Sequence, residues 1–297
     1  MSKATDICLQ QVACTRQRIQ YRTPIKFGGR VVMDAVLFNV TVDVETADGR
    51  RGQGFGSMPM GNVWAWPSVT MSGEETLAAM NEFAEQVVAA AGASHITGHP
   101  IEITHALSKD HPAITSNIAA KLALQDEMPR LAQLVAASPL EAAIYDAYGK
   151  TLGENSYNLL GPEFVNSDLA TYLTDEFRGE YLDQYTSREC KPRLPLYHLV
   201  GALDPLTDSE IATRLDDGLP ETLGEWITAD GLTHLKIKLN GDDLSWDVER
   251  VAAIERVAQE SQAARGCDTW HYSLDFNEKC ANVQYVLDFL AKVEENS

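Results

Sequence analysis

Two lysines stand among apolar residues in the segment Thr233–Asn240, THLKIKLN. Because successive side chains of a strand point to opposite faces, Lys236 and Lys238 would share one face, and the leucine and isoleucine residues beside them the other. A helical pattern over residues 244–264 and an apolar strand over residues 272–277 follow, which is a β-α-β order. Parallel strands are normally apolar on both faces, so charges that recur on one face indicate a barrel interior or crevice that carries chemistry. A half-exposed strand with a solvated lysine face is the alternative.

The composition narrows the classes of function. The chain has 297 residues, 44% of them hydrophobic, and a formal net charge of -19 at pH 7. It is long enough for two domains or one large one, and its negative charge opposes a phosphate backbone, so we expect no nucleic-acid partner. No run approaches the roughly 20 apolar residues of a membrane span, and the first residues lack the apolar core of a signal peptide, so we expect a cytoplasmic protein with no membrane partner. The five cysteines are scattered without a C-x-x-C pair, which favours reduced thiols.

The amino-terminal part predicts a small antiparallel sheet. Residues 7–57 have the pattern of a meander, and Asp48-Gly49 is a strong hairpin signal. Two segments, residues 22–29 and 58–67, are predicted as loops rich in apolar and aromatic groups. Either loop could be a lid over a ligand or could pack against the neighbouring domain.

Helices are predicted next. Residues 73–135 are rich in alanine and helical in period, and four histidines fall here without metal-ligand spacing. We expect these histidines to be solvated or to cap helices: His95, His99, His105 and His111. The sequence SPLE at residues 138–141 is a capping box with proline at the first helical position, and it predicts a helix that runs to about Leu152.

This helix carries a family resemblance. Its sequence from Glu141 to Gly153, EAAIYDAYGKTLG, closes on YNLLG at Tyr157–Gly161. It resembles the helix that joins the capping domain to the barrel in the enolase superfamily, mandelate racemase and muconate lactonizing enzyme type. The meander with its two loops, the helical stretch, this helix, the K-x-K segment and a D-x-N segment at Asp275–Asn277 follow in that family's order. The resemblance covers essentially the whole chain.

The resemblance implies an α+β capping domain followed by an α/β (TIM-type) barrel domain, of which only about the first three βα units are present. The implied divisions are a capping domain at residues 1–135, a connecting helix and insertion at 136–192, and a partial barrel at 193–297. The barrel strands would be residues 194–200, 233–239 and 271–277, with a last helix at about 282–294. A complete barrel needs roughly 250 residues, so we expect the chain to be incomplete at its carboxyl end. Residues 162–192 are expected to be surface structure.

The resemblance also implies a chemistry. Family members remove a proton from the carbon beside a carboxylate and stabilise the enediolate with Mg²⁺. Lys238 would be the base, and Lys236 would help neutralise the substrate carboxylate. Asp275 would be the first metal ligand, Asn277 would contact the substrate or a water on the metal, and Lys26 of the first loop would bind substrate.

Three functions stay open at this point. The first is a racemase, epimerase or cycloisomerase that acts on a small-molecule carboxylate, and the second is a sugar-acid dehydratase of the same superfamily. The third is a non-catalytic truncated remnant or interaction module. The further metal ligands and the second acid or base of the family cannot be found in the sequence, so we expect this chain alone to be inactive. Whether it forms a homo-oligomer is left open.

Overall fold

The computed structural model describes residues 2–27 and 30–295, which form two compact units. The first unit comprises Met1–Gln20 with Asp34–Cys190, and the second comprises Tyr21–Met33 with Lys191–Ser297. The predicted boundary between residues 135 and 136 does not mark a change of unit, whereas the one at residue 192 lies next to such a change.

The first unit is built on the predicted antiparallel meander. The strands are β1 (Ile7–Phe27), β2 (Arg30–Thr46), β3 (Arg51–Pro59) and the short β4 (Thr97–Gly98), in the order β3-β2-β1-β4. Alternate residues of β2 are buried from Val36 to Val44, so this strand presents one apolar face to the core. The predicted turn at Asp48-Gly49 joins β2 to β3, and Gly49 has a φ of 88°.

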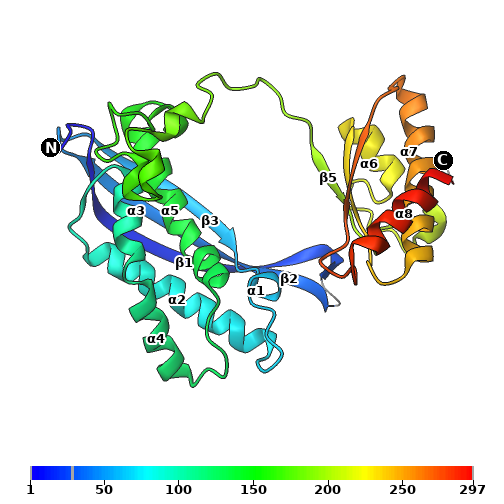
Figure 1. Ribbon diagram of the computed structural model, residues 1–297, viewed down its shortest axis with the longest axis horizontal. Coiled ribbons are helices and arrows are strands. Elements are labelled where there is room, and N and C mark those ends of the chain that lie inside the picture. The colour runs from blue at the N-terminus through cyan, green and yellow to red at the C-terminus, as the bar shows by residue number, and fades with distance from the viewer. Residues whose placement is uncertain (1, 28–29, 296–297) are drawn as a thin grey trace. The chain divides into compact units, whose positions relative to one another are not determined.

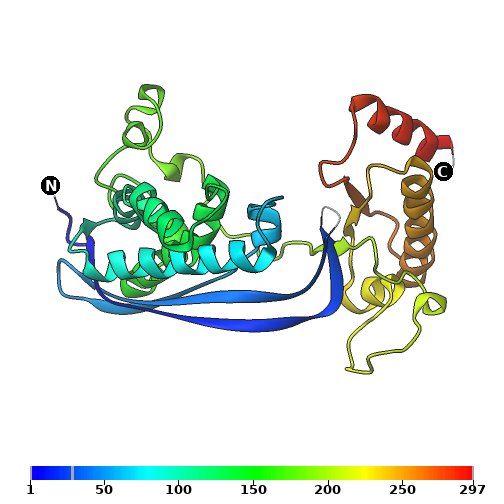
Figure 2. The same ribbon diagram turned by 90° about the horizontal axis from the view of Figure 1, so that it is seen from below.

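Helices cover one face of this sheet. They are α1 (Asn62–Ala65), α2 (Gly73–Ala93), α3 (Pro100–Ser108), α4 (His111–Leu122) and α5 (Arg130–Leu152). Figure 2 shows α2 and α5 on the same side of the strands. The start of α2 is fixed by a capping box between Ser72 and Glu75.

Helix α5 begins nine residues earlier than the SPLE capping box predicts, so the predicted start is wrong, although the helix ends at Leu152 as predicted. It starts at Arg130 and holds Pro139 in its interior. A proline there cannot donate a hydrogen bond to the carbonyl of Val135. The Ser138 hydroxyl donates to this carbonyl instead, at 2.8 Å, and the helix continues. The predicted boundary at residues 135 and 136 therefore falls inside one helix.

Helix α5 lies directly on β3 because glycines of the strand face it. A Cβ atom on Gly54 would overlap the carbonyl oxygen of Ala143 and the amide nitrogen of Ala147. A Cβ atom on Gly56 would overlap the Pro139 carbonyl oxygen. The contact is backbone against backbone, so no side chain can move to make room.

We predict that Gly54→Ala lowers the free energy of unfolding by about 3 kcal/mol or more, because overpacking against rigid backbone forces the helix off the sheet. The matched control is Gly92→Ala in α2, where the nearest atom to an added Cβ is 3.9 Å away. That variant should be neutral or gain up to about 1 kcal/mol from helix propensity. Urea unfolding measures both, and equal effects of the two substitutions would contradict the prediction.

Two of the four histidines are buried: His99, which caps a helix as expected, and His111, which contradicts the expectation. His99 has none of its surface exposed and His111 has 2%. His99 caps α3, as the capping alternative allowed: its Nδ1 accepts the Ile101 N–H at 3.2 Å. Its Nε2 lies 2.9 Å from the Leu159 carbonyl oxygen, which can only accept, so the ring is neutral with its proton on Nε2. His111 packs edge-on against Phe83, with ring centres 5.1 Å apart.

Burial lowers the pKa of His99 to about 4, although the Leu159 carbonyl and Glu102 oppose the shift. Below about pH 6.5 the unfolded chain therefore binds a proton that the folded chain does not. We predict that the stability from this group is complete above pH 6.5, declines by about 3 kcal/mol between pH 6.5 and 4, and declines no further below that. Urea unfolding should show a shallower pH dependence for His99→Asn, whereas exposed His95→Asn should follow the wild type.

Residues 162–192 were predicted as surface structure, which is wrong for the first part of the segment. Val165 and Leu169 are buried. The Asn166 side-chain amide donates to Asp6 at 3.0 Å and to Glu102 at 2.8 Å, and so ties the segment to β1's start and to α3. The segment contains short 3-10 turns at Leu169–Thr171, Asp175–Phe177 and Leu182–Gln184, and another precedes it at Ser156–Asn158.

The second unit contains three parallel βα units. Strands β5 (Tyr197–Val200), β6 (His234–Lys238) and β7 (His271–Asp275) lie in that order, within the predicted ranges. They are followed by α6 (Leu223–Asp230), α7 (Leu244–Arg265) and α8 (Val283–Glu295), with a 3-10 turn at Asp208–Glu210. Leu235 and Ile237 are fully buried in one cluster with Ile254 of α7 and Ile227 of α6. Figure 1 shows α6 and α7 on the same side of the strands, so the other face of β6 carries the lysines.

Candidate functional site

The two lysines and Asp275 meet on the face opposite α6 and α7. Strand pairing puts Lys238 directly beside Asp275 and Lys236 beside Ser273. The Lys238 Nζ lies 2.6 Å from Asp275 Oδ2, and the Lys236 Nζ lies 2.9 Å from the same oxygen. The juxtaposition predicted from strand alternation is therefore confirmed. The roles assigned to these residues stay predictions.

Asn277 closes the cluster just beyond the end of β7. Its Oδ1 accepts from the Lys238 Nζ at 2.7 Å, and its Nδ2 donates to the Leu239 carbonyl at 3.2 Å. Its own N–H donates to Asp275 Oδ1 at 2.9 Å, which a φ of 54° allows. The chain turns here, and the Asn277 amide is held just beyond the end of β7.

Opposing effects act on the Asp275 carboxyl. Partial burial favours its neutral form, but hydrogen bonds from Lys238, from Lys236 and from the Asn277 N–H outweigh burial and hold the pKa of Asp275 well below its usual range. Asp275 is therefore a carboxylate at neutral pH. Lys238 is the more enclosed lysine, with 10% of its side chain exposed against 32% for Lys236.

Lys26 lies near the same edge of the second unit. It belongs to β1 and not to a loop, so the loop prediction is wrong for residues 22–27, while residues 28–29 lie outside the described part of the chain. The Arg22 side chain, in the same part of β1, donates to both Asp217 oxygens, at 2.5 and 2.7 Å. The Lys26 Nζ donates to Asn240 Oδ1 at 3.2 Å, two residues after β6 ends.

The second predicted loop, residues 58–67, ends β3 and forms α1. Met60 and Trp66 are buried in the core of the first unit, and Trp64 is exposed. Packing within its own unit therefore accounts for part of the apolar content that suggested a lid. A meeting of the two segments over the barrel strands stays a prediction.

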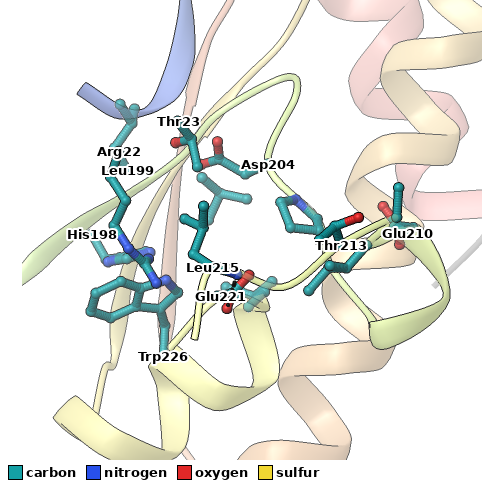
Figure 3. Close-up of a pocket in the computed structure, with 15 residues that line it drawn as sticks. Arg22, Thr23, His198, Leu199, Asp204, Glu210, Thr213, Leu215, Glu221 and Trp226 are labelled. Carbon is teal, nitrogen blue, oxygen red and sulfur yellow. Dashed lines mark hydrogen bonds between the residues drawn. The ribbon is translucent and has the colours of Figure 1, made fainter. Parts of the chain in front are cut away.

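A cavity that the sequence did not predict lies beside β5 (Figure 3). Its volume is about 550 Å³, and Arg22, Leu199 and Trp226 line it. The His198 ring lies 5.4 Å from the Trp226 ring, and burial lowers the pKa of His198. Much of the wall comes from the irregular residues 201–222, where no apolar period exists that could have indicated a cavity.

The described residues do not by themselves fit a magnesium site. Within residues 2–27 and 30–295, no three His, Cys, Asp or Glu side chains gather closely enough to hold a metal ion. Both oxygens of Asp275 are already engaged, Oδ2 by two ammonium groups and Oδ1 by a backbone N–H. Mg²⁺ requires octahedral oxygen ligands, usually with one or two carboxylates among them.

The part of the chain described here also has no helix long and apolar enough to span a membrane.

Comparison with known proteins identifies the fold. No family model and no curated protein matches the sequence. Three similar solved structures are an enolase from Bradyrhizobium with magnesium and mandelic acid (TM-score 0.54, 16% identity), a dipeptide epimerase from Enterococcus faecalis with Mg and L-Leu-L-Tyr (0.52, 16%), and the L-Ala-D/L-Glu epimerase from Bacillus subtilis (0.52, 17%). They cover 99%, 97% and 97% of this chain, which spans 60%, 58% and 58% of theirs.

The chain has the fold of the enolase superfamily, mandelate racemase and muconate lactonizing enzyme type. The resemblance predicted from the sequence is confirmed at this level. Since this chain spans about 60% of the length of the matched chains, their activities do not carry over with the fold.

We predict that Lys238 and Asp275 are coupled in stability. Asp275→Asn leaves two ammonium groups without their shared carboxylate and should cost about 2–4 kcal/mol of unfolding free energy. The double variant Asp275→Asn with Lys238→Met should cost about 1–3 kcal/mol less than the sum of the single variants.

The control is the Lys121–Glu82 pair, which is 2.8 Å long but has a lysine side chain 60% exposed. A double-mutant cycle there should give no more than about 1 kcal/mol. Urea unfolding followed by tryptophan fluorescence measures both cycles. Additive effects of the Lys238 and Asp275 substitutions would contradict the prediction.

Proposed function

We propose that Lys236, Lys238 and their neighbours remove the proton on the carbon beside the carboxylate of a small-molecule substrate, in a racemisation, epimerisation or cycloisomerisation. The observation that carries the proposal is the Asp275 carboxylate, which both ammonium groups hold at 2.6 and 2.9 Å. Two lysines that converge on one carboxylate have the spacing needed to bind the carboxylate of a substrate.

The chemistry needs this positive charge. A carbon acid beside a carboxylate loses its proton only where preorganised positive charge stabilises the developing oxyanion. Lys236 neutralises the substrate carboxylate. Lys238, once it has given its own proton to solvent, takes the α-proton. Asn277, which already accepts from Lys238, orients the base or contacts the substrate, and Lys26 adds positive charge at the carboxyl end of β6.

Magnesium is part of the proposal only as a cofactor that the family resemblance implies. The Bradyrhizobium enolase and the Enterococcus epimerase were solved with magnesium. Asp275 is the described residue that could contribute a carboxylate to such an ion, and it would have to release the lysines to do so. The ion would supply positive charge to the oxyanion, and no step is assigned to it here.

Epimerisation is favoured among the reactions because two of the similar structures are epimerases. A sugar-acid dehydratase remains the second enzyme class, since it would use the same lysines. The non-catalytic module is favoured by a separate observation: within residues 2–27 and 30–295, no three His, Cys, Asp or Glu side chains gather closely enough to hold a metal ion.

The test is hydrogen exchange of the substrate α-proton in deuterated water, followed by NMR with mandelate and L-Ala-L-Glu, with and without Mg²⁺. We predict that any exchange falls by about 10²–10⁴ in Lys238→Met, the usual contribution of a general base. Lys236→Met should mainly weaken carboxylate binding. Lys121→Met, a surface lysine of the first unit, is the control and should change neither quantity.

Each outcome separates the alternatives. Exchange that Lys238→Met abolishes supports the enzyme, and release of water from a sugar acid with formation of a keto acid supports the dehydratase. Carboxylate binding that needs both lysines but gives no exchange supports the non-catalytic module, the result expected from the sequence for residues 1–297 alone. Binding and exchange that ignore both lysines would overturn the proposal.

A further inference from the structure

A fully buried carboxylate lies beneath the cluster and has no role in the chemistry proposed so far. Asp247, in the first turn of α7, has none of its surface exposed. Its Oδ1 accepts the Asn240 N–H at 2.7 Å. Its Oδ2 accepts the Gly241 N–H at 2.9 Å and the Tyr285 hydroxyl at 2.6 Å. A buried carboxylate is costly unless it is hydrogen-bonded, and here three donors from the β6–α7 turn and α8 satisfy it.

The turn that Asp247 holds is where site residues attach. The Asn240 side chain accepts the Lys26 ammonium at 3.2 Å, and the Leu239 carbonyl accepts the Asn277 amide at 3.2 Å. The Leu239 N–H donates to the Asp275 carbonyl at 2.9 Å. The turn thus contacts three of the five candidate site residues, and its backbone position sets where Lys26 and Asn277 can lie.

Capping of α7 does not explain Asp247. The helix is capped by another carboxylate, Asp243, whose side chain accepts the Trp246 N–H at 3.1 Å. The Asp247 carboxylate accepts hydrogen bonds from the turn and from Tyr285 instead. Burial, and then the hydrogen bond to Asp247, raise the pKa of Tyr285, so its phenol keeps the proton that it donates.

We propose that Asp247 is a positioning residue: it fixes the turn Leu239–Gly241 and, through it, the side chains of Lys26 and Asn277. It does not touch the substrate. The inference rests on the proposed function for the roles of Lys26 and Asn277, but the geometry that it asserts is independent of that function. Asparagine cannot replace the carboxylate, because it has one acceptor oxygen and its NH₂ group would face a donor.

The test compares Asp247→Asn with Asp243→Asn in the full chain. Both remove a charge from the start of α7, but Asp243→Asn keeps an oxygen that can cap the helix and leaves the hydrogen bonds of the turn alone. With mandelate as the probe, Asp247→Asn should raise the dissociation constant about tenfold, as expected for a lost charged hydrogen bond. Asp243→Asn should leave it unchanged. The effects of Asp247→Asn and Lys26→Met should be less than multiplicative, since the first acts partly through the second.

A second measurement needs no ligand. In protein labelled with ¹⁵N-asparagine, the side-chain amide signals of Asn240 and Asn277 should both shift in Asp247→Asn and stay in place in Asp243→Asn. Unmoved signals in Asp247→Asn overturn the inference. If the signals shift in Asp247→Asn but the wild-type protein does not bind mandelate, the inference about Asp247 stands and the proposed function fails. If Asp247→Asn does not fold, Tyr285→Phe removes one of the three hydrogen bonds and should shift the Asn240 signal in a folded protein; no shift there also overturns the inference.

Discussion

One carboxylate balances two ammonium groups on the face of the parallel sheet that the helices leave free. The balance exists because β6 and β7 pair in parallel with Lys238 beside Asp275, so both side chains project from the same level. A shift of one residue in this pairing would send the Asp275 side chain to the apolar face, among Leu235 and Ile237, where an unpaired carboxylate is strongly disfavoured. The charges therefore help to fix the strand register as well as form the site.

The sequence was sufficient where a short-range rule determines the structure. Alternation alone put Lys236 and Lys238 on one face, and the β-α-β order put Asp275 beside them. The sequence was insufficient where the structure of a segment depends on contacts with other parts of the chain. The capping box at Ser138 was a false start signal, because the Ser138 hydroxyl bonds the carbonyl that Pro139 leaves unpaired. β1 extends to Phe27 as the neighbour of β2 in the sheet, and residues 22–27 by themselves do not show that pairing.

Asp247 was missed for a related reason. In the sequence it is one acid among several near the start of a helix, and only the folded turn shows that its oxygens face backbone donors and Tyr285. The cavity beside β5 gave no periodic signal either, since irregular chain forms much of its wall. Residues that do chemistry were thus easier to find than residues that hold them in place, because reactive side chains are distinctive types while supporting ones are common.

The contact between α5 and β3 matches a two-residue repeat of the strand with a four-residue repeat of the helix, and these repeats differ in length. Every second residue of the strand, Gly52, Gly54 and Gly56, meets every fourth residue of the helix in reverse order, from Thr151 towards Pro139. Two strand residues advance about 6.8 Å and four helical residues about 6.0 Å, so the two spacings differ by about 0.8 Å at each step. Over three contacts the accumulated difference between the two spacings is small, but over six contacts it would separate the paired positions. The difference therefore limits how many residues of a helix can pack directly against the backbone of such a strand.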